Sequence, residues 1–170
     1  VYKRNINLPS GGNIVIDSTE ALVSIDVNSA RSTKGSDIEE TALNTNIEAA
    51  VEILTQLKLR DIGGLVVIDF IDMMSINSQK NVMRKVAEYA KKDKAKIQFA
   101  RISKFGLMEL SRQKLKSSII QNNYENCPTC DGTGQIKSLS SLAISVLRII
   151  EEEAINSKNK ETVYLPVRLA

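Results

Sequence analysis

Histidine and tryptophan are both absent from this 170-residue chain. Without histidine, mechanisms that use an imidazole as general acid, general base or zinc ligand are excluded for these residues. Aromatic residues make up only 4% of the chain, so few side chains can serve as stacking platforms for nucleic-acid bases. If such a chain breaks phosphodiester bonds, a metal ion held by carboxylates is the obvious means.

Long apolar runs are lacking as well. No stretch approaches the roughly 18–20 apolar residues of a membrane-spanning helix, and residues 1–12 lack the apolar segment of a secretory signal. With 42% hydrophobic and 25% charged residues, the composition is typical of a soluble globular protein. The two cysteines make no disulfide framework and suit a reducing cytoplasm. Because the chain begins with Val1 rather than Met, we expect a fragment of a longer protein.

Positive charge is concentrated in one part of the chain. The net charge is only +3, but residues 91–116 contain nine Lys or Arg against two Asp or Glu, a local +7, so the remainder sums to −4. A local excess of this size is expected where phosphates bind. A solvated helix end followed by a loop would give the same pattern, and charge alone does not decide between them.

Hydrophobic periodicity predicts a layered α/β fold with a mixed sheet flanked by helices. We expect strands at Asn13–Asp17, Ala21–Asn28, Leu65–Ile71 and Lys96–Ile102, and helices at Ser36–Leu59 and Ser78–Lys91. Ser36 and Glu39 have the spacing of a capping box at a helix start. The nearly continuous apolar run Leu65–Ile71 predicts a strand buried on both faces.

The end of the chain has a different character. Ser140–Glu153 predicts an amphipathic helix with Leu142, Val146, Ile149 and Ile150 on one side, and a strand-like segment, VYLPVRL, follows at 163–169. The apolar side of this helix could pack on its own domain or on a partner chain.

Two aspartates stand out as candidate metal ligands. On the expected strand SIDVN, Ser24, Asp26 and Asn28 share one face, and Asp69 lies within the apolar run VVIDFID. A carboxylate there must be hydrogen-bonded, ion-paired or bound to a metal. Two such aspartates on adjacent strands favour Mg²⁺, which takes one or two carboxylates and keeps several waters. Asp72 is expected at a turn or helix start, or beside the metal ligands.

Cys127 and Cys130 form a C-x-x-C pair followed by Asp-Gly-Thr-Gly. A structural zinc site needs four ligands, and the chain supplies two thiolates and no histidine, so a complete site requires two chains. The alternative is a redox dithiol, but that motif normally opens a helix, which the following glycines discourage. We therefore favour zinc shared between subunits.

Basic residues near these motifs are candidate RNA contacts. Arg31 and Lys34 follow the strand that carries Asp26, and Lys104, Arg112 and Lys114 flank FGLMELSRQ. Each could contact a phosphate and position a strand without reading its sequence. Each could equally be an exposed surface charge.

Several long motifs occur in a definite order: SIDVNSAR, GSDIEETALNTNIEAA, GGLVVIDFIDM, ISKFGLMELSRQKL and CPTCDGTG. Together they resemble the ribonuclease E/G family from about Ser10 to Ala154. The resemblance implies a DNase I-like catalytic subdomain over residues 1–126, a zinc link over 127–138 and the start of a small dimerisation domain over 139–170. The family's RNA-binding and 5′-sensor domains precede the region that is present here.

The resemblance also implies residue roles. Asp26 and Asp69 would hold Mg²⁺, and Asn28 would hydrogen-bond the metal-bound water or the scissile phosphate. The family hydrolyses single-stranded, often AU-rich RNA to 5′-phosphate and 3′-hydroxyl ends. Cys127 and Cys130 would share one Zn²⁺ with a second subunit in a homodimer; pairing of dimers into tetramers is left open. The expected location is the cytoplasm, or peripherally the inner membrane for a full-length protein. The alternative is a zinc-linked dimerisation or RNA-contact module without catalysis.

Overall fold

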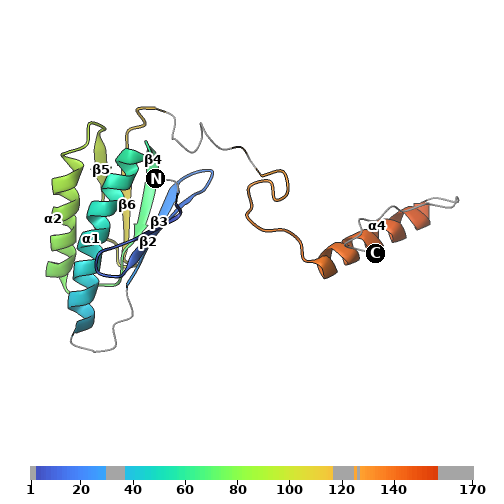
Figure 1. Ribbon diagram of the computed structural model, residues 1–170, viewed down its shortest axis with the longest axis horizontal. Coiled ribbons are helices and arrows are strands. Elements are labelled where there is room, and N and C mark those ends of the chain that lie inside the picture. The colour runs from blue at the N-terminus through green and yellow to red at the C-terminus, as the bar shows by residue number, and fades with distance from the viewer. Residues whose placement is uncertain (1–2, 30–36, 117–124, 126, 157–170) are drawn as a thin grey trace. The chain divides into compact units, whose positions relative to one another are not determined.

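The computed structural model describes residues 3–29, 37–116, 125 and 127–156 (Figure 1). The chain divides into two compact units, Val1–Tyr124 and Glu125–Ala170. The three-part division made from the sequence, at 126/127 and 138/139, stays a prediction.

The first unit is built on a mixed six-stranded sheet, which confirms the predicted α/β class. Its strands are β1 (Asn5–Asn7), β2 (Asn13–Ser18), β3 (Val23–Asn28), β4 (Gly64–Asp69), β5 (Ile97–Phe99) and β6 (Leu107–Arg112). They lie in the order β1-β2-β3-β4-β6-β5. Of these strand pairs, only β3 and β4 run parallel; the rest are antiparallel. The carboxyl ends of β3 and β4 therefore meet at one edge of the sheet.

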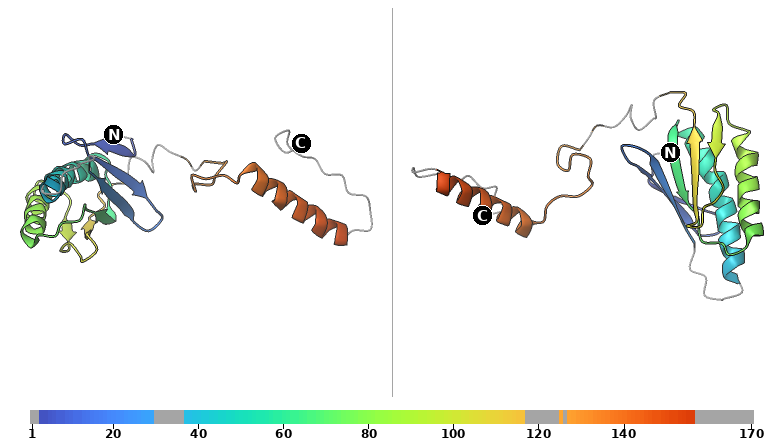
Figure 2. Two further views of the ribbon diagram at one scale, coloured as in Figure 1. Left: turned by 90° about the horizontal axis from the view of Figure 1, so that it is seen from below. Right: turned by 180° about the vertical axis from the view of Figure 1, so that it is seen from behind.

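Two helices, α1 (Asp37–Leu59) and α2 (Ile76–Ala90), lie side by side on one face of this sheet (Figures 1 and 2). The strands alternate accordingly: Ile25, Val27, Val66 and Ile68 are buried in the core that the helices share. The prediction that the Leu65–Ile71 strand is buried on both faces is wrong. Leu65 is 45% exposed, because the helices cover only the opposite face.

Two strands were not predicted. β1 has three residues, too few for a clear pattern. β6 runs through the segment that was treated above as a basic RNA-contact region, and it lies between β4 and β5. Its alternating burial places Met108, Leu110 and Arg112 inward.

The predicted capping box takes another form. The carboxylate of Glu39 accepts hydrogen bonds from the backbone N–H groups of Met74, at 3.0 Å, and Ser75, at 3.1 Å. Glu39 thus ties the start of α1 to the segment before α2. Ser36 lies outside the described residues.

The second unit contains α4 (Leu139–Asn156), close to the predicted helix. Several of its large apolar side chains are exposed in this chain: Leu139, Leu142, Ile144, Leu147, Ile149 and Ile155. The strand-like segment at 163–169 lies outside the described residues. Among the residues that are described, no helix is both long enough and apolar enough to cross a membrane.

Candidate metal centre

Asp26 and Asp69 are direct neighbours across the parallel β3–β4 pair. Both are the exposed members of their alternating strands, so both project from the face that the helices leave open. Adjacent strands lie about 4.8 Å apart, and directly paired residues point to the same side. The register therefore brings the two predicted carboxylates together at an accessible edge of the sheet.

Asn28 belongs to the same group. Its side-chain Nδ2 donates a hydrogen bond of 2.8 Å to Oδ2 of Asp26 and one of 3.2 Å to Oδ1 of Asn13. Asn13 is the direct partner of Asn28 across the β2–β3 pair. The sequence interpretation missed Asn13, although a polar residue opposite Asn28 in the predicted hairpin was a usable signal. These contacts fix the orientation of the Asp26 carboxylate.

Gly106 brings the turn before β6 against two carboxylates. A Cβ atom at this position would lie 3.2 Å from Oδ1 of Asp72, 3.9 Å from Oδ1 of Asp69 and 3.1 Å from the carbonyl oxygen of Phe70. The backbone of Gly106 also has φ of +78°, which favours glycine. Asp72 and Asp69 therefore both approach Gly106, and a role for Asp72 beside the metal ligands stays a prediction.

The charges at this edge favour a cation. Partial burial, followed by the negative charges of Asp26 and Asp72, raises the pKa of Asp69 above its ordinary value. A cation would relieve this repulsion and favour the ionised carboxylate. Within the described residues no three Asp, Glu or Cys side chains form a complete protein cage for a metal. Two carboxylates suit Mg²⁺, because this ion retains several of its waters.

Asn46 of α1 fixes the end of β4. This side chain is fully buried. Its Nδ2 donates to the carbonyl oxygen of Ile71 at 2.8 Å, and its Oδ1 accepts from the N–H of Ile71 at 3.0 Å. Ile71 lies between Asp69 and Asp72 in the chain, so Asn46 positions the segment that carries both. The signal for Asn46 was a polar residue four positions after Ala42 and before Ala50, on the apolar side of the predicted helix.

Comparison with known proteins shows which family the chain belongs to. The ribonuclease E/G family model matches residues 1–115. The chain belongs to the ribonuclease E/G family. A second model, described as the RNase E/G thioredoxin-like domain, matches residues 126–170.

Individual relatives resemble the chain over nearly its whole length. It is 54% identical to ribonuclease E of Haemophilus influenzae over 170 residues, which are 99% of this chain and 18% of that protein. It is 53% identical to ribonuclease E of Escherichia coli, over 99% of this chain and 16% of that protein. Identity to ribonuclease G of Escherichia coli is 35%, over 87% of this chain and 30% of that protein. The chain thus spans less than a fifth of the ribonuclease E relatives and resembles them more than this ribonuclease G.

The basic residues predicted to contact RNA in this ribonuclease E/G family chain differ in their exposure to solvent, where the structure describes them. Arg31 and Lys34 lie outside the described residues. Lys104 is exposed in the β5–β6 turn. Arg112 is 2% exposed, and it is held by Asp93, with Nε 2.8 Å from Oδ2, and by the carbonyl oxygen of Ile62, 2.9 Å from Nη1. A buried, ion-paired guanidinium cannot reach RNA, so the RNA-contact prediction for Arg112 is not retained.

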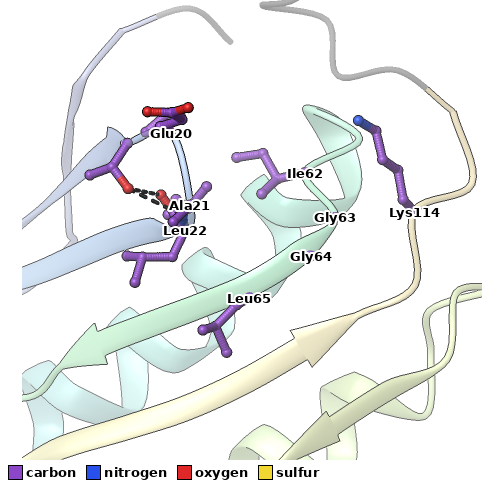
Figure 3. Close-up of a pocket in the computed structure, with 11 residues that line it drawn as sticks. Glu20, Ala21, Leu22, Ile62, Gly63, Gly64, Leu65 and Lys114 are labelled. Atoms are coloured by element: carbon purple, nitrogen blue, oxygen red, sulfur yellow. Dashed lines mark hydrogen bonds between the residues drawn. The ribbon is translucent and has the colours of Figure 1, made fainter.

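A cavity of about 330 Å³ lies at the other end of the sheet (Figure 3). Its walls come from the β2–β3 turn, the start of β4 and Lys114. The strand β4 starts at this cavity and ends at Asp69, so the cavity is separate from the carboxylates. Its lining includes Glu20 and Lys114 but no pair of metal ligands, and we therefore place the candidate site of this ribonuclease E/G family chain at the carboxylate edge.

Cys127 and Cys130 lie in a compact turn rather than at a helix start. The N–H of Asp131 donates to the carbonyl oxygen of Cys127 at 2.8 Å, and the N–H of Thr133 donates to that of Cys130 at 2.9 Å. The backbone amides of Thr129 and Cys130 lower the pKa of the Cys127 thiol. Such amide donors stabilise thiolates, the form that binds zinc. Both cysteines are free in this chain.

Proposed function

We propose that this chain forms the hydrolytic centre of an endoribonuclease that cleaves single-stranded RNA with Mg²⁺. The observation that supports this best is the direct pairing of Asp26 with Asp69 across β3 and β4. Membership of the ribonuclease E/G family supports the same chemistry.

In this proposal Asp26 and Asp69 hold the metal ion. When bound, Mg²⁺ would act as a Lewis acid, favouring loss of a proton from the attacking water and stabilising negative charge on the phosphate. Attack of water on phosphorus agrees with 5′-phosphate and 3′-hydroxyl products and requires no histidine. Asn28 holds the Asp26 carboxylate in one orientation, and Asn46 holds the backbone that follows Asp69. Of the basic residues, Lys104 is exposed and lines a cavity together with Asp72, which supports a phosphate contact by Lys104 in this proposal. Arg31 and Lys34 are kept as further candidates.

Single-turnover cleavage of a short AU-rich RNA with Mg²⁺ tests this function. We expect Asp26→Asn and Asp69→Asn each to lower the rate about 100-fold or more, the scale seen when one catalytic group is removed. Asp17→Asn is a matched control, because Asp17 lies on β2 of the same sheet, is partly exposed and pairs with Arg4. Equal cleavage by all four proteins would exclude a role for the carboxylate pair.

The C-x-x-C pair supports a second role. We propose that Cys127 and Cys130 provide half of a Zn²⁺ site that joins two chains. The exposed apolar side chains of α4 could be buried against the partner chain in the same dimer. This role is independent of catalysis: a chain without nuclease activity that still dimerises with zinc would be a zinc-linked structural module.

A further inference from the structure

The turn between β5 and β6 displays an aromatic side chain to solvent. Phe105 is 82% exposed, and it is the one exposed aromatic residue in the part of the chain that the structure describes. The other described aromatics are buried or partly buried: Phe70, Phe99 and Tyr89. A single exposed apolar side chain is ordinary on a protein surface, but this ring lies on a turn between two strands, and turns held on a rigid scaffold often carry binding residues.

The turn that carries Phe105 is held by four hydrogen bonds. The N–H of Ser103 donates to the carbonyl oxygen of Leu107 at 2.8 Å, and that of Gly106 donates to Ser103 at 3.2 Å. The N–H of Phe105 itself donates to Oγ of Ser103 at 3.2 Å. The N–H of Phe70 donates to the carbonyl oxygen of Gly106 at 3.3 Å. The turn is thereby tied to β4 immediately after Asp69, so the ring is presented from a fixed backbone.

This position adjoins the candidate metal centre. Gly106, the next residue, is the one whose added Cβ would lie 3.9 Å from Asp69 and 3.2 Å from Asp72. The residue before Phe105 is the exposed cation Lys104. A cavity of about 330 Å³ lies beside the turn, and its lining includes Asp72, Met73, Met74, Ile102 and Lys104. Met74 is 96% exposed, which adds apolar surface next to this cavity.

We propose that Phe105 stacks on an RNA base next to the scissile phosphate while Lys104 contacts the adjoining backbone. A combination of an aromatic ring with a cation is how proteins bind single strands without reading sequence. The surrounding segment 91–116 carries a net charge of +7, which complements RNA. This inference rests on the proposed function and adds a nucleobase subsite to it. Phe105 acts as a positioning residue, because it holds the substrate strand.

A tryptophan probe tests the contact without any cleavage. The chain contains no tryptophan, so Phe105→Trp introduces a single tryptophan, which can be excited selectively over the four tyrosines. Titration with a single-stranded oligouridine in buffer without Mg²⁺ and without a chelator, where a Mg²⁺-dependent enzyme is silent, should quench its emission saturably. Leu59→Trp is the control. Leu59 is exposed at the end of α1, shortly before the start of β4, whereas the turn adjoins the other end of β4. The emission of a tryptophan at position 59 should therefore not change. No quenching of Phe105→Trp, or equal quenching of both, would overturn the proposal.

Cleavage kinetics give a second readout. Phe105→Ala should weaken RNA affinity about 5- to 150-fold, as expected for the loss of one stacked base, with a smaller effect on the rate at saturating RNA. Phe105→Tyr keeps an aromatic ring and should bind RNA about as tightly as wild type, whereas Phe105→Leu should bind as weakly as Phe105→Ala. Unchanged affinity of Phe105→Ala contradicts the proposal, as does equal affinity of the Tyr and Leu variants.

The two proposals fail in different ways. If wild type and Asp69→Asn behave alike in cleavage, the hydrolytic function is rejected and the tryptophan titration alone decides on the stacking site. If cleavage requires Asp69 but Phe105→Ala binds and cleaves like wild type, the stacking site alone is rejected.

Discussion

Asn46 meets Ile71 as a neighbouring β-strand would. One side-chain amide both accepts from the N–H and donates to the carbonyl oxygen of the same residue, at 3.0 and 2.8 Å. The ladder of β4 ends at Asp69, so the helix supplies a pair of hydrogen bonds that the sheet no longer provides. The segment from Asp69 to Asp72 is therefore held by a buried side chain rather than left as a loose loop.

Removing this amide should disturb both stability and metal binding. Asn46→Ala leaves two backbone groups of Ile71 without partners, and we expect unfolding free energy to fall by about 1–3 kcal/mol. Mg²⁺ affinity should fall about tenfold, as for loss of other groups that support metal ligands. Gln56→Ala is the control, since Gln56 is a buried amide on the same helix that bonds Glu52 and Arg60 instead. Urea denaturation measures the unfolding free energy of each variant, and Mg²⁺ titration measures its metal affinity. Similar metal affinity in the two variants would contradict a positioning role for Asn46.

Alanine substitutions at Gly106 and Gly64 distinguish the effect of backbone strain from the effect of crowding the carboxylates. Both have positive φ, +78° and +98°, so an alanine is strained at either position by about 1–2 kcal/mol. Only at Gly106 would the new methyl group approach carboxylates; at Gly64 nothing lies within 4 Å. We expect both alanine variants to lose stability, but only Gly106→Ala to lose Mg²⁺ affinity and cleavage. Calorimetry of Mg²⁺ binding measures the difference, and equal affinities would show that Gly106 does not shape the site.

The buried Arg112–Asp93 pair should make stability depend on pH. Burial by itself would raise the pKa of Asp93, but the hydrogen bonds from Arg112 and from the amide of Ala95 outweigh burial and hold the pKa below its usual value. The stabilisation is therefore complete above the unfolded-state pKa of about 3.9. It is lost as pH falls through the lower folded-state value. We expect Asp93→Asn to cost about 3–5 kcal/mol at neutral pH, because it leaves a buried charge unpaired.

An exposed pair on the same sheet provides the comparison. Arg4 also pairs with an aspartate, Asp17, but at the surface, where solvent screens the interaction. Asp17→Asn should change stability far less than Asp93→Asn. Urea denaturation of both variants from pH 7 to pH 3 should show the gap between wild type and Asp93→Asn narrowing with acid. A constant gap would mean that Asp93 contributes through packing alone.

Zinc content tests the proposed link between subunits. We expect half an equivalent of Zn²⁺ per chain, and Cys127→Ser or Cys130→Ser should remove the metal and shift the chain toward monomer in sedimentation. Asp131→Asn lies in the same turn, at φ of +48° where asparagine is tolerated, and should keep both zinc and dimer. A chain without zinc whose two thiols oxidise reversibly would favour the redox alternative.

Sequence patterns predicted that Asp26 and Asp69 are neighbours better than they predicted the surroundings of these two residues. Asp26 and Asp69 stood out because each is a charge within an apolar strand, and the period of two fixes the face of each strand. Arg112 was misplaced because its environment depends on β6 pairing with β4 and on Asp93 from another segment. Asn46 was missed because a polar residue on the buried side of a helix shows its role only when its partner, 25 residues away, is known. Long-range partners of this kind leave little trace in local periodicity.

The side-chain alternation of β4 ties correct folding to the presence of the site. A slip of one residue in its pairing would turn Asp69 toward α1 and α2 and expose Ile68, which is now 1% accessible, and every other residue of the strand would reverse with it. Such a sheet would bury the unpaired carboxylate of Asp69 in the apolar core and expose the side chain of Ile68 to water. The misaligned pairing is therefore much less stable than the native one. Chains that fold with the native pairing have Asp26 and Asp69 side by side on the solvent-facing side of the sheet.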